Sequence, residues 1–274
     1  MKRKISLGII ILLLLPMLAA CQKEGPAPNS YEGIREKGKI VMGTSADFPL
    51  NEFHAMVNGE DRIVGYELAL GEYIAQRLGV DFELVDMSFE NLLNSLALGQ
   101  VDMVIAGIGN NPGRDVNFTI PYDDGGGHNS LLIRKEDSPS YREMEDFEGG
   151  KLGAQLGTIQ ERLLKESGVD LELKTLSSID SLVLELKTHK IDGICMANEA
   201  ATAYEKTNDD LKIVDTIVLQ YAEDEDKGNC VALKKGNDRL TEEINKIIVD
   251  LREEGLLDAW KEEAMEYINL QIEN

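Results

Sequence analysis

Cysteine, histidine and aromatic residues are all scarce in this chain of 274 residues. It has three cysteines, three histidines and one tryptophan, and aromatic side chains make up only 5% of the sequence. The histidines, His54, His128 and His189, stand far apart without a second metal ligand at helical spacing, so we expect no metal site and no cofactor. Cys195 and Cys230 lie in apolar, strand-like segments, which favours two buried reduced thiols, with a disulfide as the alternative.

Basic residues are few relative to acidic ones. The chain has 28 lysines and arginines against 50 aspartates and glutamates, for a formal net charge of -22. This balance argues against nucleic acid and against an anionic membrane surface as partners. A buried ligand site can carry its own local charge, so we interpret most of the excess acid as a solvated shell.

The N-terminal apolar run is too short for a membrane-spanning helix, which needs about 20 apolar residues. It extends from Leu7 to Leu15 after three basic residues and is followed by Leu18-Ala19-Ala20-Cys21. This order is typical of a cleaved secretion signal. The last four residues resemble the bacterial lipobox, which implies that residues 1–20 are removed and that Cys21 is acylated. Secretion without lipidation is the alternative.

The segment after Cys21 cannot form a core of its own. Gln22–Ser30 is polar and contains two prolines, which indicates a flexible tether. We assign the lipidated cysteine and its tether to residues 21–37.

Short apolar, β-branched runs then alternate with amphipathic helical stretches, which indicates an α/β fold with mainly parallel strands. The pattern also repeats at an offset of 90 positions, so that Glu90 to Asp102 matches Asp180 to Asp192 in spacing. This repeat favours two similar lobes. The expected strands are Lys39–Thr44, Phe82–Val85, Asp102–Ala106, Lys151–Gln155, Leu171–Lys174 and Cys230–Lys234, and the expected helices are Tyr66–Leu78, Phe89–Leu98, Thr158–Glu166, Asn198–Lys206, Asp238–Glu254 and Leu256–Ile268.

The predicted architecture is two lobes, each a sheet flanked by helices, joined by two hinge crossings. Residues 38–123 and 230–274 are assigned to the first lobe, and residues 124–229 to the second lobe with hinge segments at its ends. A cleft between hinged lobes is a common ligand site.

Several short motifs resemble the polar-amino-acid family of periplasmic solute-binding proteins. Gly43–Pro49 and Val101–Gly107 are similar to the family's first-strand loop and third strand, and Pro112-Gly113-Arg114 is followed by the family's Phe and Pro-Tyr at Phe118 and Pro121. In the second lobe Gly157-Thr158, Lys190-Ile191-Asp192 and Ala203-Tyr204 occur in the family's order. The resemblance covers nearly the whole chain from Gly38 and implies the two-lobed fold of type II periplasmic binding proteins.

The resemblance also implies a ligand site in the cleft. Arg114 would pair its planar guanidinium with a ligand carboxylate, and aromatic rings at Phe48 and Phe89 would pack on the ligand, although either ring could be core instead. Thr158 is also a helix N-cap residue by its sequence context. The complete predicted set is Ser45, Phe48, Phe89, Gly107, Gly109, Arg114, Gln155, Thr158, Ile159 and Asn198.

One position departs from the family. Ala197 stands where the family usually has an acid for the ligand's α-ammonium group. A buried ammonium without a counter-ion is costly, so Glu199, Asp47 or Asn198 would have to compensate, or the ligand lacks a free amine. We therefore expect an amino acid or a related small carboxylate, without choosing one.

The predicted function is ligand capture for an ABC importer by a monomeric lipoprotein on the outer face of the cell membrane, with the permease as partner. A dehydratase-like enzyme on the same fold is one alternative, but the sequence shows no paired carboxylates or nucleophile motif. A ligand-sensing lipoprotein is another. We expect no catalytic residue.

Overall fold

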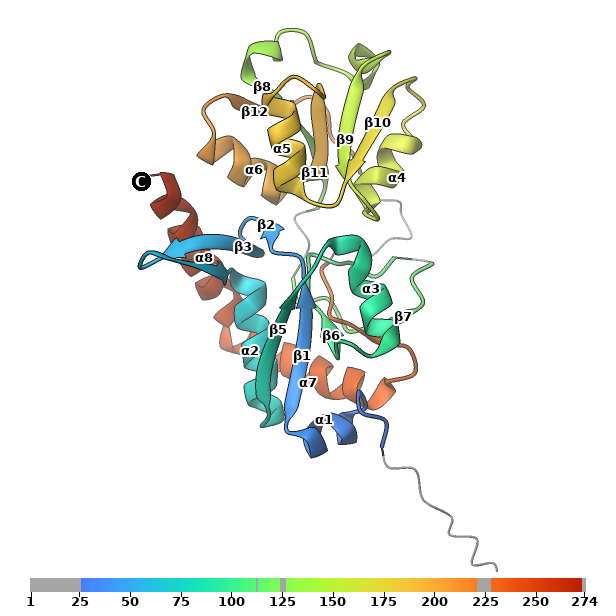
Figure 1. Ribbon diagram of the computed structural model, residues 1–274, viewed down its shortest axis with the longest axis vertical. Coiled ribbons are helices and arrows are strands. Elements are labelled where there is room, and N and C mark those ends of the chain that lie inside the picture. The colour runs from blue at the N-terminus through green and yellow to red at the C-terminus, as the bar shows by residue number, and fades with distance from the viewer. Residues whose placement is uncertain (1–25, 112, 124–126, 221–227, 273–274) are drawn as a thin grey trace, which may run out of the picture.

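The computed structural model describes residues 26–111, 113–123, 127–220 and 228–272. Two five-stranded sheets lie one above the other along the long axis of the molecule (Figure 1). The lower sheet, with its helices, is called the first lobe here, and the upper sheet with its helices the second lobe. The first sheet has the strand order β5 (Asp81–Asp86), β1 (Lys39–Thr44), β6 (Met103–Val104), β13 (Ala232–Lys234), β7 (Val116–Phe118).

The second sheet is built in the same way as the first. Its order is β10 (Glu172–Leu176), β9 (Lys151–Gln155), β11 (Gly193–Ala197), β8 (Asn129–Arg134), β12 (Leu211–Ile213). In each sheet the first three strands pair in parallel, and the last two pair antiparallel to their neighbours. The chain passes from the first sheet to the second between β7 and β8, and returns between β12 and β13.

The repeat seen in the sequence has a structural counterpart. Asp102 and Asp192, 90 positions apart, each accept a backbone hydrogen bond through Oδ2, from Val41 N and Lys151 N respectively, both at 2.8 Å. Their own N–H groups donate to the carbonyls of the same two residues. Each aspartate therefore connects the turn before one strand to a neighbouring strand. The sequence repeat reflects this pair of hydrogen bonds, which occurs once in each lobe.

Helices cover both faces of each sheet, because residues along the central strands alternate between two apolar clusters. Ile40 and Met42 of β1 pack with α2 (Tyr66–Leu78) and α7 (Asp238–Glu254), whereas Val41 packs with α3 (Phe89–Leu98). In the second lobe, α5 (Ile179–Lys187) and α6 (Asn198–Thr207) cover one face and α4 (Ile159–Lys165) covers the other. Two 3-10 turns, Lys135–Asp137 and Met144–Phe147, follow β8.

A three-stranded antiparallel sheet and the last helix reach from the first lobe toward the second. The sheet consists of β2 (Asp47–Phe48), β3 (Glu52–Val57) and β4 (Glu60–Val64). Helix α8 (Leu256–Ile272) runs past α2 and ends near α6 (Figure 1). Ile268 of α8 is 2% exposed in a cluster with Phe53, Val64 and Ala203 of α6, so this cluster joins elements of both lobes.

The structure confirms the predicted fold class, and most of the long elements begin and end within two residues of the predicted limits. The assigned tether is too long at its C-terminal end. Residues Tyr31–Lys37 form helix α1, which is capped by Ser30 and closed by Gly38, because Ile34 is buried in the first core. Cys195 and Cys230 are both buried thiols, as expected. Cys21 lies outside the described residues.

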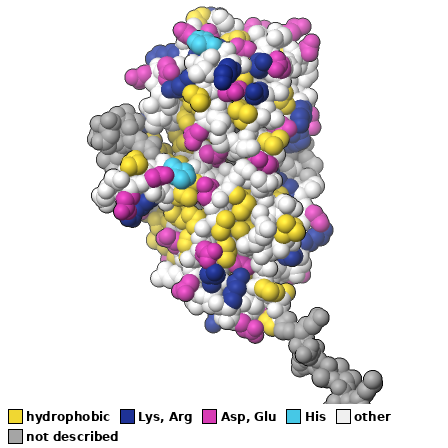
Figure 2. Space-filling model, viewed as in Figure 1, with side chains coloured by type: hydrophobic (Ala, Val, Ile, Leu, Met, Phe, Trp, Pro, Cys, Tyr) yellow, Lys and Arg dark blue, Asp and Glu magenta, His cyan; other side chains and the backbone are white. Residues whose placement is uncertain are grey.

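Acidic side chains are spread over both lobes with basic ones among them (Figure 2). Among the described helices, none combines the length and apolarity of a transmembrane span.

Candidate functional site

A cleft lies where the two lobes meet, and the term cleft below refers to this cavity. Its volume is about 880 Å³, counting the part open to solvent. Both lobes contribute walls. The first supplies Ser45, Asp47, Phe48, Glu52, Phe89, Ala106, Gly107, Gly109 and Arg114, and the second supplies Gln155, Thr158, Ile159, Gln160, Ile179, Leu182, Ile194, Cys195, Met196, Ala197 and Glu199. The segment that returns to the first sheet supplies Gly228 and Asn229.

Arg114 is the basic side chain of this lining. Its Nη1 donates to the carbonyl of Gly109 at 3.1 Å, and its guanidinium lies 5.9 Å from the centre of the Phe89 ring. These two contacts hold the guanidinium in place in the segment between β6 and β7. A planar, fixed fork of N–H donors is suited to a carboxylate.

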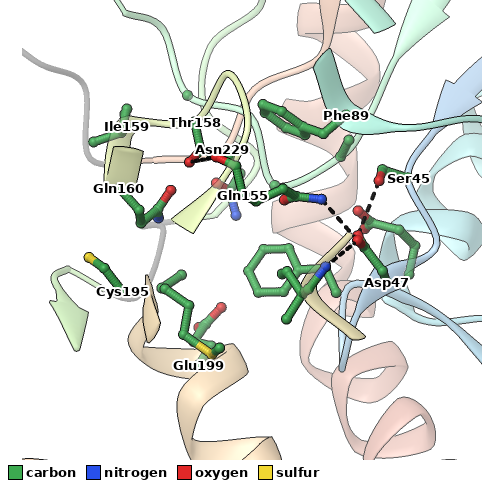
Figure 3. Close-up of a pocket in the computed structure, with 18 of the residues that line it drawn as sticks. Ser45, Asp47, Phe89, Gln155, Thr158, Ile159, Gln160, Cys195, Glu199 and Asn229 are labelled. Atoms are coloured by element: carbon green, nitrogen blue, oxygen red, sulfur yellow. Dashed lines mark hydrogen bonds between the residues drawn. The ribbon is translucent and has the colours of Figure 1, made fainter. Parts of the chain in front are cut away.

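Asp47 connects the two lobes. Its Oδ2 accepts hydrogen bonds from Gln155 Nε2 at 2.9 Å and from the backbone N–H of Ile179 at 2.8 Å, and both donors belong to the second lobe (Figure 3). Ser45 donates to Oδ1 at 3.1 Å. Burial raises the pKa of Asp47 to about 6, although these three hydrogen bonds oppose the shift. Asp47 therefore joins the lobes beside the ligand space.

Gly107 lets an aromatic ring approach the backbone. Its φ is +55°, and a Cβ built there would lie 2.4 Å from Cε1 of Phe48. The Gly107 N–H donates to Glu67 Oε2 at 2.9 Å. A side chain at this position would displace the Phe48 ring, so glycine is required for the shape of this wall.

The second-lobe wall is formed by the end of β9 and the start of α4. Thr158 caps α4, accepting from Glu161 N at 3.3 Å, and its hydroxyl donates to the carbonyl of Gln155 at 2.6 Å. Gln160 Nε2 donates to the buried Asn129 Oδ1 at 2.6 Å. These bonds hold Gln155, Thr158 and Gln160 in place along one side of the cleft (Figure 3).

A buried pair of acids lies beneath the cleft. Glu52 is 1% exposed and Glu67 is fully buried. Glu67 accepts from Tyr122 Oη at 2.7 Å and from Asn51 Nδ2 at 2.6 Å in addition to Gly107 N. Burial raises the pKa of both carboxyl groups, and the negative charge of Glu67 raises the pKa of Glu52 further.

The structure brings nine of the ten predicted ligand-contact residues to the cleft, and Asn198 is the exception. Asn198 Oδ1 accepts from Ser130 Oγ at 2.8 Å, so its side chain is used within the second lobe. Of the three candidates to replace the acid missing at Ala197, Asp47 and Glu199 line the cleft.

Sequence reasoning did not include Glu52 and Asn229 in the site. Glu52 had no usable signal, because acidic residues are usually exposed and its strand, β3, is only partly buried. Asn229 had none either, because its place depends on the return of the chain to the first sheet. Its N–H donates to Asp123 Oδ1 at 3.1 Å.

Comparison with known proteins gives a family and several relatives. Residues 40–266 match the family described as bacterial extracellular solute-binding proteins, family 3. The arginine-binding extracellular protein ArtP of Bacillus subtilis is 32% identical over 255 residues, which cover 90% of this chain and 95% of that protein. The L-cystine-binding protein TcyJ of Escherichia coli K12 is 27% identical over 84% of this chain and 83% of its own.

A solved structure agrees with the sequence match. An amino acid ABC transporter substrate-binding protein from Streptococcus pneumoniae, bound to L-arginine, superposes with a TM-score of 0.80 at 34% identity, over 85% of this chain and 96% of that one. These relatives are named as binding proteins, and the enzyme alternative is set aside. By the family match, the chain belongs to the bacterial extracellular solute-binding proteins of family 3.

Proposed function

We propose that this solute-binding protein captures a cationic amino acid, arginine or a close analogue, and delivers it to an ABC importer. The observation that carries the proposal is the charge distribution in the cleft. The lining has the basic side chain of Arg114 on one side and the acidic side chains of Asp47, Glu52 and Glu199 elsewhere. An amino acid with a cationic side chain has one carboxylate and two positive groups, which matches one base and several acids.

The relatives support the same ligand class. ArtP and the Streptococcus pneumoniae protein are both named with arginine. In the proposed arrangement, Arg114 pairs with the ligand carboxylate, and Glu199 or Asp47 takes the place of the acid absent at Ala197. Phe48 and Phe89 pack on the aliphatic part of the ligand.

Two finer parts of the proposal rest on the sequence and the family. The lipobox-like Leu18–Cys21 supports anchoring through a lipid on Cys21 at the outer face of the cell membrane. The family's role in ABC transport supports a permease as the partner of the ligand-bound form, with the protein acting as a monomer. Incorporation of labelled palmitate into the full chain, compared with Cys21→Ala, tests the anchor.

Isothermal titration calorimetry with arginine and citrulline tests the ligand class. Citrulline has nearly the shape of arginine but a neutral ureido group. We expect arginine to bind at least about 100-fold more tightly, because an unpaired acidic wall costs about 3 kcal/mol or more. Citrulline or cystine binding as tightly as arginine would overturn the cationic assignment.

A further inference from the structure

Glu52 and Glu67 are two buried carboxyl groups beneath the cleft, and Glu52 is the one that lines it. A buried carboxylate is stable only where hydrogen-bond donors or positive charges surround it, and otherwise the group holds a proton and is neutral. The donors around each group therefore decide which of the two carries a proton.

The surroundings place this proton on Glu52. Glu67 receives hydrogen bonds from Tyr122 Oη, Asn51 Nδ2 and Gly107 N, and such donors stabilise a carboxylate. Glu52 Oε2 is buried and accepts from no donor in the described part of the chain. A charged carboxylate oxygen left like this costs far more free energy than the oxygen of a neutral, protonated carboxyl group.

The charged groups that face the pair are mainly acidic. Asp47 on β2, Asp86 at the end of β5 and Glu67 on α2 act on Glu52, and Asp123 acts on Glu67. Lys261 of α8 pairs with Asp123, with its Nζ 3.6 Å from Asp123 Oδ2. His54, on β3 itself, faces the exposed Asp61 at 3.0 Å and Asp86 at 3.8 Å. With acidic groups around it, the Glu52 carboxyl group is therefore kept neutral by its proton.

We propose that a cationic ligand entering the cleft displaces the proton held by Glu52, so that capture of the ligand releases a proton to solvent. This inference rests on the proposed function, because it requires a positively charged ligand. The O–H bond of Glu52 breaks, its electron pair stays on the carboxylate, and the ligand cation takes over as counter-ion. A neutral analogue offers no replacement charge and leaves the proton in place.

This exchange makes affinity depend on pH in one direction. While Glu52 is protonated in the free protein, each unit of pH increase raises the affinity for arginine by up to about tenfold. The rise stops once Glu52 is ionised without ligand. Burial and the negative charge of Glu67 raise the pKa of Glu52 well above its usual value, which favours the protonated form in the free protein.

Calorimetry of the full chain with arginine at pH 7.5, in phosphate and in Tris, measures the released proton. This pH is above the value of about 6 for Asp47, so Asp47 is already ionised. We expect the binding enthalpy to differ between the buffers by an amount that corresponds to proton release, up to one proton per arginine. Glu52→Gln should abolish the difference, whereas Asp86→Asn, which removes a neighbouring charge outside the cleft lining, should retain it.

Infrared difference spectroscopy covers the case in which Glu52→Gln no longer binds arginine. In the unaltered protein, arginine should remove the C=O band of a protonated carboxyl group. Arginine binding with equal enthalpies in both buffers and no loss of that band would overturn the inference but leave the proposed function intact. Failure of arginine to bind at all would instead overturn the proposed function.

Discussion

At the scale of single residues, Asp47 is a buried charge that lowers stability and also the acceptor of hydrogen bonds that join the two lobes. Its Oδ2 accepts both bonds from the second lobe, and Oδ1 accepts the bond from Ser45. Because the bonds divide in this way, asparagine can reproduce them, with its carbonyl facing the second lobe and its amide donating to Ser45. The Asp47→Asn substitution therefore removes the buried charge while keeping the geometry.

Asp47→Asn should change how stability depends on pH. The folded protein holds the Asp47 proton up to about pH 6, compared with an ordinary value of 3.8, so between these values the folded state binds more protons than the unfolded state. Stability then falls as pH rises through this window. Relative to the unaltered protein, the variant should gain roughly 1 to 3 kcal/mol between pH 4 and pH 7. Urea unfolding of both proteins from pH 4 to pH 8 measures this gain, and parallel profiles would contradict it.

Arg114→Ala tests the proposed carboxylate contact. We expect the variant to bind arginine more weakly by roughly 2 to 5 kcal/mol, as removal of one partner of a buried charge pair generally does. Arg114→Lys is the matched control, because it keeps the charge but loses the planar fork. Its affinity for arginine should lie between those of the unaltered protein and Arg114→Ala. Titration calorimetry measures all three proteins, and an unchanged affinity for Arg114→Ala would remove this residue from the site.

The residues found from sequence differ in kind from those that were missed. Arg114, Phe48 and Thr158 belong to short motifs whose spacing is fixed within one segment. Glu52 belongs to a different element from these motifs, and its role depends on burial at the cleft that a linear sequence does not display. Asn198 was assigned to the cleft by alignment, but its bond to Ser130 depends on which way the side chain turns at the start of α6.

At the scale of elements, periodicity predicted the long helices and central strands well. Helices α2, α3 and α7 have the predicted limits, because each is amphipathic and ends at a glycine in the left-handed region. The strands β2, β7 and β12 were missed, because two or three residues are too few to establish a period. The longer strands β3, β4 and β8 were missed as well. Helix α1 was missed because its seven residues lie beside a proline-containing segment typical of a tether.

Helix α8 extends beyond its predicted end, Ile268, to Ile272, and Ile268 lies in the cluster shared with α6. Ile268→Ala should lower the free energy of unfolding by roughly 2 to 5 kcal/mol, because the neighbours cannot fully close the cavity. Glu266→Ala, an exposed position on the same helix, is the control and should change stability by less than about 0.5 kcal/mol. Equal urea midpoints for the two variants would show that this cluster contributes little.

At the scale of the whole molecule, the two passages of the chain between the sheets make relative movement of the lobes the natural way to admit a ligand. The two lobes also contact each other outside the cleft lining. Ser177 Oγ of the second lobe donates to Glu90 Oε1 of the first at 2.8 Å, and neither residue lines the cleft. This bond reports on closure without touching the ligand space.

We therefore expect ligand binding and closure to be coupled. Arginine, by contacting both lobes, should shift the population toward the closed form and reduce the radius of gyration measured by X-ray scattering. Ser177→Ala should weaken arginine binding about two- to fivefold, the effect of one exposed hydrogen bond, by lowering the closed population alone. Ser178→Ala is unsuitable as a control because Ser178 caps α5, so Ser140→Ala, on the loop after β8, serves instead. Identical scattering with and without saturating arginine would rule out closure, and equal affinities for Ser177→Ala and Ser140→Ala would show that the Glu90 contact does not contribute to it.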